Sequence, residues 1–201
     1  MRKMILSAAF VIAATAALAQ APADTVRVRG TVQSVDGSML TVKSRDGADL
    51  KIKLADNAVI RTVTGKTVAD VKQGLFVGIT AMPQPDGTQK AVEIHIFPEA
   101  ARGTGEGHRP WDLMPGSTMT NANVEQLVTA VDGPMLTMKY KEGEKKISVP
   151  NNATIVQFVN GDKADLKPGA KVFIGAFTKL PDGSLEAAGI NVGKDGIVPP
   201  M

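Results

Sequence analysis

The chain contains one pattern twice, and this repetition restricts the folds that it can adopt. The segment Val35-Asp36-Gly37-Ser38-Met39-Leu40-Thr41 returns as Val131-Asp132-Gly133-Pro134-Met135-Leu136-Thr137, at a numbering offset of 96. The offset becomes 95 after Gly143 and returns to 96 near Asp182, as a one-residue deletion followed by a one-residue insertion would produce. Self-similarity of this kind is typical of a single folding unit that is used twice. We therefore expect two copies of one unit, over residues 25–97 and 121–193.

Within each copy, apolar residues alternate with polar residues, which is the period of a β-strand with one buried face. In the first copy, Leu50, Ile52 and Leu54 alternate with lysines. Comparable rows occur at residues 75–81 and 92–96, and in the second copy at residues 136–140, 172–176 and 188–192. Asp-Gly pairs between the rows, such as Asp36-Gly37, predict hairpin turns because glycine accepts a positive φ. The pattern predicts an all-β fold.

The first strand of each copy shows the same alternation. Val28 and Val32 fall on one face, and the offset of 96 assigns Val124 and Val128 to the equivalent positions. One short segment in each copy, residues 67–72 and 163–167, breaks the strand pattern and predicts a helical turn. Short antiparallel strands around one small helix favour two tandem small antiparallel OB-like β-barrels joined by an ordered linker. An SH3-like barrel or a small sandwich would fit the same periodicity.

The connection between the copies, residues 98–120, is rich in glycine and proline and has no period, as expected of a linker. A plain spacer would be polar, whereas this strap contains Trp111, Leu113, Met114 and Met119. We therefore expect its apolar side chains to hold the strap against both barrels. Residues 194–201 are expected to form an irregular tail.

Residues 1–19 have the features of a secretory signal peptide. Arg2 and Lys3 are basic, an apolar stretch runs from Ile5 to Leu18, and Ala17-Leu18-Ala19 fits a cleavage site. The prediction is an exported protein, periplasmic or secreted, without a membrane span. The signal carries two of the 23 basic residues and none of the 20 acidic ones, so the remaining chain is nearly neutral. This charge gives no electrostatic reason to expect nucleic-acid binding.

The most specific run of the strap region is His95-Ile96-Phe97-Pro98-Glu99 followed by Gly103-Thr104-Gly105-Glu106-Gly107-His108-Arg109-Pro110-Trp111-Asp112-Leu113. Together with the barrel pattern and the ending Gly193-Lys194-Asp195-Gly196, it resembles an uncharacterised family of exported bacterial proteins. The resemblance implies tandem OB-like domains of unknown function, and it supplies no catalytic or binding residues. Some relatives are labelled as a metal transporter permease, which would need several spanning helices that this sequence lacks.

The inventory of reactive side chains argues against an enzyme. The sequence has no cysteine and only two histidines, His95 and His108, which leaves little material for a catalytic triad or a multi-histidine metal site. Ser117 lies in Pro115-Gly116-Ser117-Thr118-Met119, which lacks the second glycine of a nucleophile elbow. His95 alternates with Ile94 and Ile96, and we interpret it as a surface histidine.

One group of residues suggests a metal-binding site: His108, Trp111, Met114 and Met119. Thioether and imidazole ligands suit Cu(I) and Ag(I), and tryptophan can place its π face over a cation. The group is similar to the site of the periplasmic copper- and silver-binding barrels of efflux systems, which combines histidine, tryptophan and two methionines. The Trp111-x-x-Met114 spacing matches, but Met119 lies five positions beyond Met114 rather than two. The alternative is that these apolar residues anchor the strap.

Two hypotheses follow from the sequence. The first is a non-enzymatic exported interaction or structural module without a cofactor, which binds a protein or a small ligand on a barrel face or on the strap. The second is a periplasmic Cu(I)- or Ag(I)-binding chaperone with His108, Trp111, Met114 and Met119 as ligands.

Overall fold

A computed structural model describes residues 27–129 and 133–200. The predicted signal peptide, residues 1–19, lies outside the described residues. The prediction of an all-β fold is confirmed, because the described residues form thirteen strands, and their only helices are single 3-10 turns. This part of the chain contains no helix with the length and hydrophobicity needed to cross a membrane.

The strands of the N-terminal half are β1 (Val28–Asp36), β2 (Met39–Ser44), β3 (Asp49–Gly65), β4 (Phe76–Pro83) and β5 (Gln89–Ile96). The connection contains β6 (Gly107–Pro110). The strands of the C-terminal half are β7 (Thr118–Val128), β8 (Met135–Tyr140), β9 (Gly143–Ser148), β10 (Thr154–Asn160), β11 (Lys171–Ile174), β12 (Thr178–Lys179) and β13 (Leu185–Gly193). The 3-10 turns are η1 (Val68–Asp70), η2 (Glu99–Ala101), η3 (Lys163–Asp165) and η4 (Lys194–Gly196).

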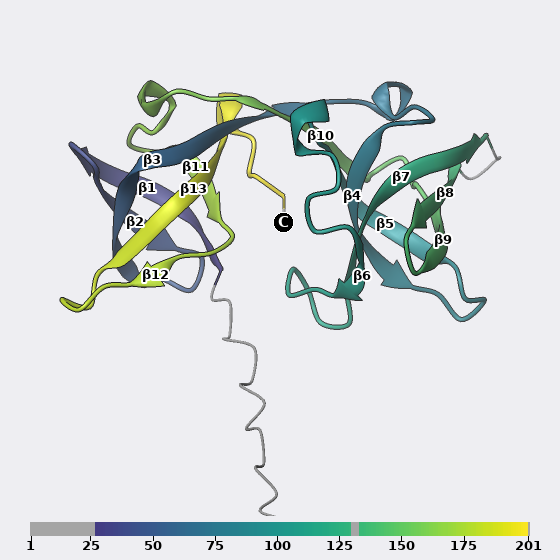
Figure 1. Ribbon diagram of the computed structural model, residues 1–201, viewed down its shortest axis with the longest axis horizontal. Helices are drawn as coiled ribbons and strands as arrows, with labels where there is room; N and C mark the ends of the chain where they lie inside the picture. The colour runs from purple at the N-terminus through teal and green to yellow at the C-terminus, as the bar shows by residue number, and fades with distance from the viewer. Residues whose placement is uncertain (1–26, 130–132, 201) are drawn as a thin grey trace, which may run out of the picture.

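Strand pairing closes two circuits of five strands (Figure 1). In the first barrel, β1 pairs with β2, β2 with β3, β3 with β13, β13 with β11, and β11 with β1. In the second barrel, β7 pairs with β8, β8 with β9, β9 with β5, β5 with β4, and β4 with β7. Each barrel therefore has five strands, and one pairing in each, β3 with β13 and β5 with β9, is parallel rather than antiparallel.

Each barrel combines strands from both halves of the chain. The first barrel takes β1–β3 from the N-terminal half and β11 and β13 from the C-terminal half, and the second takes β4 and β5 from the N-terminal half and β7–β9 from the C-terminal half. The expected boundaries, residues 25–97 and 121–193, therefore do not coincide with the barrels. The physical reason is the length of β3, which continues for 17 residues across to the other barrel, so that β4 and β5 begin there. Figure 1 shows β3 and β10 crossing between the two barrels.

The crossing strands pair with each other in a symmetric register. Val63 of β3 faces Phe158 of β10, while Arg61 faces Asn160 and Gly65 faces Val156. The numbering difference between Val63 and Phe158 is 95, which is the offset between the two halves in this region. Positions that the predicted repeat relates thus face each other at the centre of the antiparallel pair.

Each barrel has its own apolar core. Val28, Leu40 and Ile52 of the N-terminal half pack with Val172, Ile174 and Ile190 in the first barrel. Val77, Ile79 and Ile94 pack with Val124, Leu136 and Ile147 in the second. A third cluster lies between the barrels, and it comprises Val63, Val156, Phe158 and Phe173 with Phe97, Trp111 and Ile197 against them. Burial of this third apolar surface holds the barrels together.

One predicted equivalence is wrong. Val32 is buried in the first barrel, but Val128, assigned to the same position by the offset of 96, is 49% exposed. The strand pairs make Val124 the equivalent of Val32 instead. Val32 faces Val42, and Val124 faces Met138, which the offset of 96 assigns to the position of Val42. The connection from β7 to β8 is longer than that from β1 to β2, which shifts the position of the strand.

The strap and the tail are both ordered. Residues 107–110 of the strap form β6, which pairs with β7. The last three residues of the strap, 118–120, belong to β7 itself. After η4, the tail stays irregular as predicted, but Ile197 packs on the third cluster, and Pro199 and Pro200 are buried. Figure 1 shows the end of the chain entering the space between the barrels.

Candidate binding cleft between the barrels

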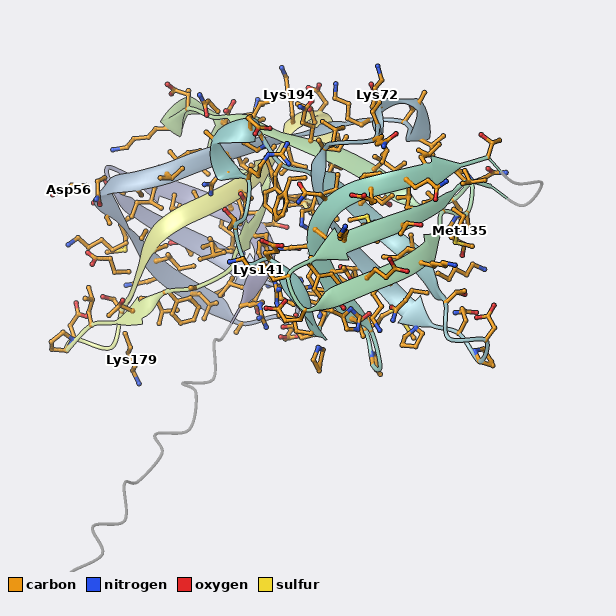
Figure 2. The ribbon with its side chains drawn as sticks, turned by 45° about the vertical axis from the view of Figure 1, so that its right-hand side comes forward. Asp56, Lys72, Met135, Lys141, Lys179 and Lys194 are labelled. Carbon is orange, nitrogen blue, oxygen red and sulfur yellow. The ribbon has the colours of Figure 1, made fainter. Side chains whose placement is uncertain are left out.

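A cavity of about 740 Å³ lies between the barrels, and we call it the central cleft. One wall comes from β1, β2 and β11 of the first barrel, and the other comes from β5 of the second. The strap contributes Leu113, and the tail contributes Val198, Pro199 and Pro200. Its volume falls in the range of small-molecule sites, which often occur where two domains meet. Side chains from both barrels fill much of the remaining space between the ribbons (Figure 2).

Four basic residues line the central cleft: Arg29, Lys43, Arg45 and Lys171. The Lys171 ammonium donates a hydrogen bond to the Thr31 hydroxyl at 2.9 Å. Lys43, Arg45 and Lys171 form no ion pair with any carboxylate of the described residues. Their charges leave the cleft with an uncompensated positive potential, which favours an anionic ligand.

The acidic residue of the cleft is Glu93, which is only 2% exposed. Its carboxylate accepts a hydrogen bond of 2.6 Å from the buried Thr80 hydroxyl. Burial raises the pKa of Glu93 from 4.5 to about 7, although the Thr80 hydrogen bond and the charge of Arg29 act to lower it. Near neutral pH this carboxyl group therefore exchanges its proton, and the charge of the cleft changes with it.

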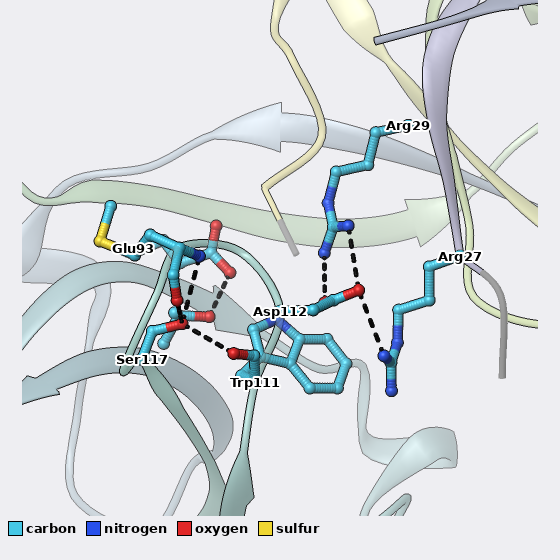
Figure 3. A network of polar contacts seen from close by, with 8 residues as sticks. Arg27, Arg29, Glu93, Trp111, Asp112 and Ser117 are labelled. Carbon is cyan, nitrogen blue, oxygen red and sulfur yellow. Dashed lines mark hydrogen bonds and ion pairs between the residues drawn. The ribbon is translucent and has the colours of Figure 1, made fainter. Parts of the chain in front are cut away.

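Asp112 of the strap connects the second barrel to the start of β1 (Figure 3). Its carboxylate accepts hydrogen bonds from Arg29 at 2.9 and 3.4 Å, and it forms an ion pair with Arg27 at 3.3 Å. Partial burial acts to raise the pKa of Asp112, but the two arginines hold it below its usual value. The Arg27 guanidinium also lies over the Trp111 ring, 4.1 Å from its centroid. The strap thus contacts both barrels.

A smaller cavity of about 200 Å³, which we call the polar cavity, shares no lining residue with the central cleft. Three residues that line it each have a buried side-chain atom without a hydrogen-bond partner among the described residues: His95 Nδ1, Trp111 Nε1 and Asn121 Oδ1. Two arginines, Arg61 and Arg109, also line it. Buried polar atoms are almost always paired in proteins, so three unpaired ones around a single cavity indicate a missing partner.

His95 was expected at the surface, and the structure places it in the interior instead, with 2% exposure. It does lie on the face of β5 opposite Ile94 and Ile96, but the strap and β10 cover that face. Its ring packs against Phe97 and Phe158, with centroids 5.0 and 5.4 Å away. Burial, with a contribution from the charge of Arg109, lowers its pKa to about 3, so the imidazole is neutral.

Space for His95 comes from Gly78, the residue that faces it on β4. A Cβ atom on Gly78 would lie 1.9 Å from His95 Nε2. In the first barrel the equivalent cross-strand pair is Phe173 with Asn191. The two halves therefore divide the available volume differently, with glycine beside histidine in one and phenylalanine beside asparagine in the other.

The four residues of the predicted metal site do not converge. Trp111 and Met119 line the polar cavity. His108 lies on the other face of β6, where its Nδ1 is 2.8 Å from the Thr120 hydroxyl, and Met114 is 38% exposed in the loop that follows. Within the described ranges, no three His, Cys, Asp or Glu side chains come together as a metal site. The Cu(I) or Ag(I) hypothesis gains no support from this arrangement.

Sequence reasoning did not identify Glu93, Arg29, Arg61 or Asn121 as site residues. Glu93 gave no distinct signal, because it occupies a polar position in the alternating row of residues 92–96. The others look like ordinary strand positions, and only the exchange of strands brings them to face the opposite barrel.

Residues 29–95 match the model of a family described as Domain of unknown function (DUF5666). The match agrees with the expected resemblance to an uncharacterised family over this part of the chain. No curated protein and no solved structure matches the chain significantly. The matched residues run from β1 to β5, so they contribute three strands to the first barrel and two to the second.

Proposed function

We propose that this protein is a non-enzymatic, exported binding module that holds a small amphipathic anion in the central cleft. Support for export comes from the basic, apolar and small-residue segments at Arg2-Lys3, Ile5 to Leu18 and Ala17-Leu18-Ala19. Support for binding comes from the cleft itself, which has charged groups at its rim and apolar groups from Val92, Leu113 and Val198.

The proposal includes a duplicated OB-like unit with exchanged strands. In the first circuit β1 pairs with β2 and β11, and β3 pairs in parallel with β13. In the second circuit β7 pairs with β8 and β4, and β9 pairs in parallel with β5. A Greek-key barrel of five strands is the OB arrangement, in which loops and one barrel face bind ligands. Exchange between two copies would create a cleft that neither copy has alone.

One observation carries the functional proposal. Lys43, Arg45 and Lys171 surround a cavity of about 740 Å³ and lack carboxylate partners among the described residues. Lys43 of β2, Arg45 of the turn after β2 and Lys171 of β11 all line this one cavity. An anion with an apolar body would compensate these charges and cover the apolar lining.

The test measures binding of 1-anilinonaphthalene-8-sulfonate by its fluorescence. The double variant Lys43→Glu/Lys171→Glu should weaken binding by at least about tenfold, because it reverses two charges at the rim. The matched control is Lys72→Glu/Lys179→Glu, which makes the same change in net charge at side chains that point away from the molecule (Figure 2).

The control should leave binding close to that of the wild type, and added salt should weaken wild-type binding. Equal loss in both double variants would show that only the net charge matters, and it would refute the proposed site. Circular dichroism of each variant separates loss of binding from loss of fold.

A further inference from the structure

We propose that the polar cavity is a second, separate site, which binds a compact aromatic carboxylate. The cavity shares no lining residue with the central cleft. Three features of the lining point to this ligand: unpaired polar atoms, arginines without carboxylate partners, and aromatic rings.

The unpaired atoms specify hydrogen bonds that a ligand must make. Trp111 Nε1 can only donate, and Asn121 Oδ1 can only accept. The Asn121 amide nitrogen donates to the Thr104 carbonyl at 3.0 Å, which fixes the orientation of the amide. His95 Nδ1 can do either, since the neutral imidazole has two tautomers. His95 and Asn121 are 2% and 5% exposed, so bulk water does not satisfy them. A carboxylate can accept from Trp111, and a water beside it can donate to Asn121.

The two arginines specify the sign of the ligand's charge. Arg109 donates to the Gly105 carbonyl at 2.7 Å, and its guanidinium lies 5.5 Å from the centroid of the Trp111 ring. Neither Arg109 nor Arg61 forms an ion pair with a carboxylate in the described part of the chain. Burial and the neighbouring charge of Arg27 lower the pKa of Arg109, which is the mark of a cation without a counterion. Water alone would leave both charges uncompensated, whereas a carboxylate forms charge-assisted hydrogen bonds with guanidinium groups.

The remaining lining specifies the body of the ligand. Phe97, Phe158 and Met119 supply apolar surface beside the polar groups. A volume of about 200 Å³ holds roughly seven water-sized groups, enough for one aromatic ring with its carboxylate. A tetrahedral phosphate would satisfy the arginines but would leave the rings without a partner, so the lining favours the carboxylate.

Trp111 makes the site measurable, because it is the only tryptophan in the sequence and it lines the cavity. We expect saturable quenching or a spectral shift of tryptophan fluorescence with benzoate, and a matching rise in the melting temperature. Arg61→Gln should weaken binding by at least about tenfold, as the loss of a charge-assisted hydrogen bond predicts. The Arg61 side chain makes no hydrogen bond or ion pair with a described residue, so the variant should fold. Arg45→Gln, at the rim of the other cavity, is the matched control.

Two further probes make the outcome decisive. Benzamide has the shape of benzoate without the charge, and inorganic phosphate has charge without the ring; each should bind at least about tenfold more weakly than benzoate. The proposal is overturned if benzoate gives no saturable change, if benzamide or phosphate binds equally well, or if Arg61→Gln binds like the control. Saturation by benzoate that Lys43→Glu/Lys171→Glu leaves intact would separate this site from the central cleft.

Discussion

Single residues decide how the interface between the barrels is filled. Gly78 leaves room for the His95 ring, and the equivalent pair in the first barrel reverses the sizes, with Phe173 beside Asn191. Interiors are packed as densely as organic crystals, so a large residue on one strand requires a small one opposite. The alternation of His95 with Ile94 and Ile96 could be read from the sequence. Its burial could not, because the covering groups come from the strap and from β10.

A prediction at this scale concerns Glu93→Gln. The pKa of Glu93 is higher in the folded protein, about 7, than its usual 4.5, so the folded state binds the proton more tightly. Stability should therefore fall as the pH rises from about 4.5 to 7 and remain lower above 7, by about 3 kcal/mol. Glutamine keeps an acceptor for the Thr80 hydroxyl and carries no charge, so it should remove this loss.

The measurement is urea denaturation of the wild type and Glu93→Gln at pH 5 and pH 8. The free energies of unfolding should be similar at pH 5, and the variant should be more stable by up to about 3 kcal/mol at pH 8. Glu144→Gln removes an exposed carboxylate and should show no such difference. A variant that is less stable than the wild type at pH 8 would contradict the burial argument.

At the scale of elements, the strap contacts both barrels and connects them. Its strand β6 adds to β7, and the residues after it place Asp112 between Arg27 and Arg29. The apolar content of the strap indicated that it would pack on the barrels. The charged contact was not predictable, since nothing in the sequence relates residue 112 to residues 27 and 29.

We predict that Asp112→Asn loosens the strap locally without a large effect on global stability. The Asp112 side chain is 46% exposed, so solvent screens its ion pairs, and their net contribution should stay below about 1 kcal/mol. Hydrogen exchange of residues 111–117 should become faster, while exchange in β4 and β5 stays unchanged. The control is Asp46→Asn, which has no ion pair with a described residue. Unchanged exchange in the strap would show that Trp111 alone holds it.

At the scale of the whole molecule, the exchange of strands makes the two barrels interdependent. Neither half of the chain contains all five strands of a barrel, and each crosses to the other through β3 or β10. The DUF5666 match covers one half, so the matched unit is divided between the two barrels.

The corresponding prediction is that residues 27–97 alone do not form a stable monomer. Their β1–β3 lack the partners β11 and β13, so the sheet would be left with open edges. A second copy can supply β4 and β5 instead, and we expect light scattering to give the mass of a dimer. Mixing with residues 98–200 should yield a heterodimer in place of the homodimer. A folded monomer would mean that the half can close on itself.

The sequence by itself determined the strands, most of their buried faces and the turns between them, because alternation and glycine positions are local properties of the chain. The similarity of the two segments also led to the prediction of one unit used twice. Only the tertiary structure decided which half completes which barrel, because a strand end can pair with either of two similar partners. That choice rests on β3 continuing as one strand into the opposite barrel, and both cavities exist because of it.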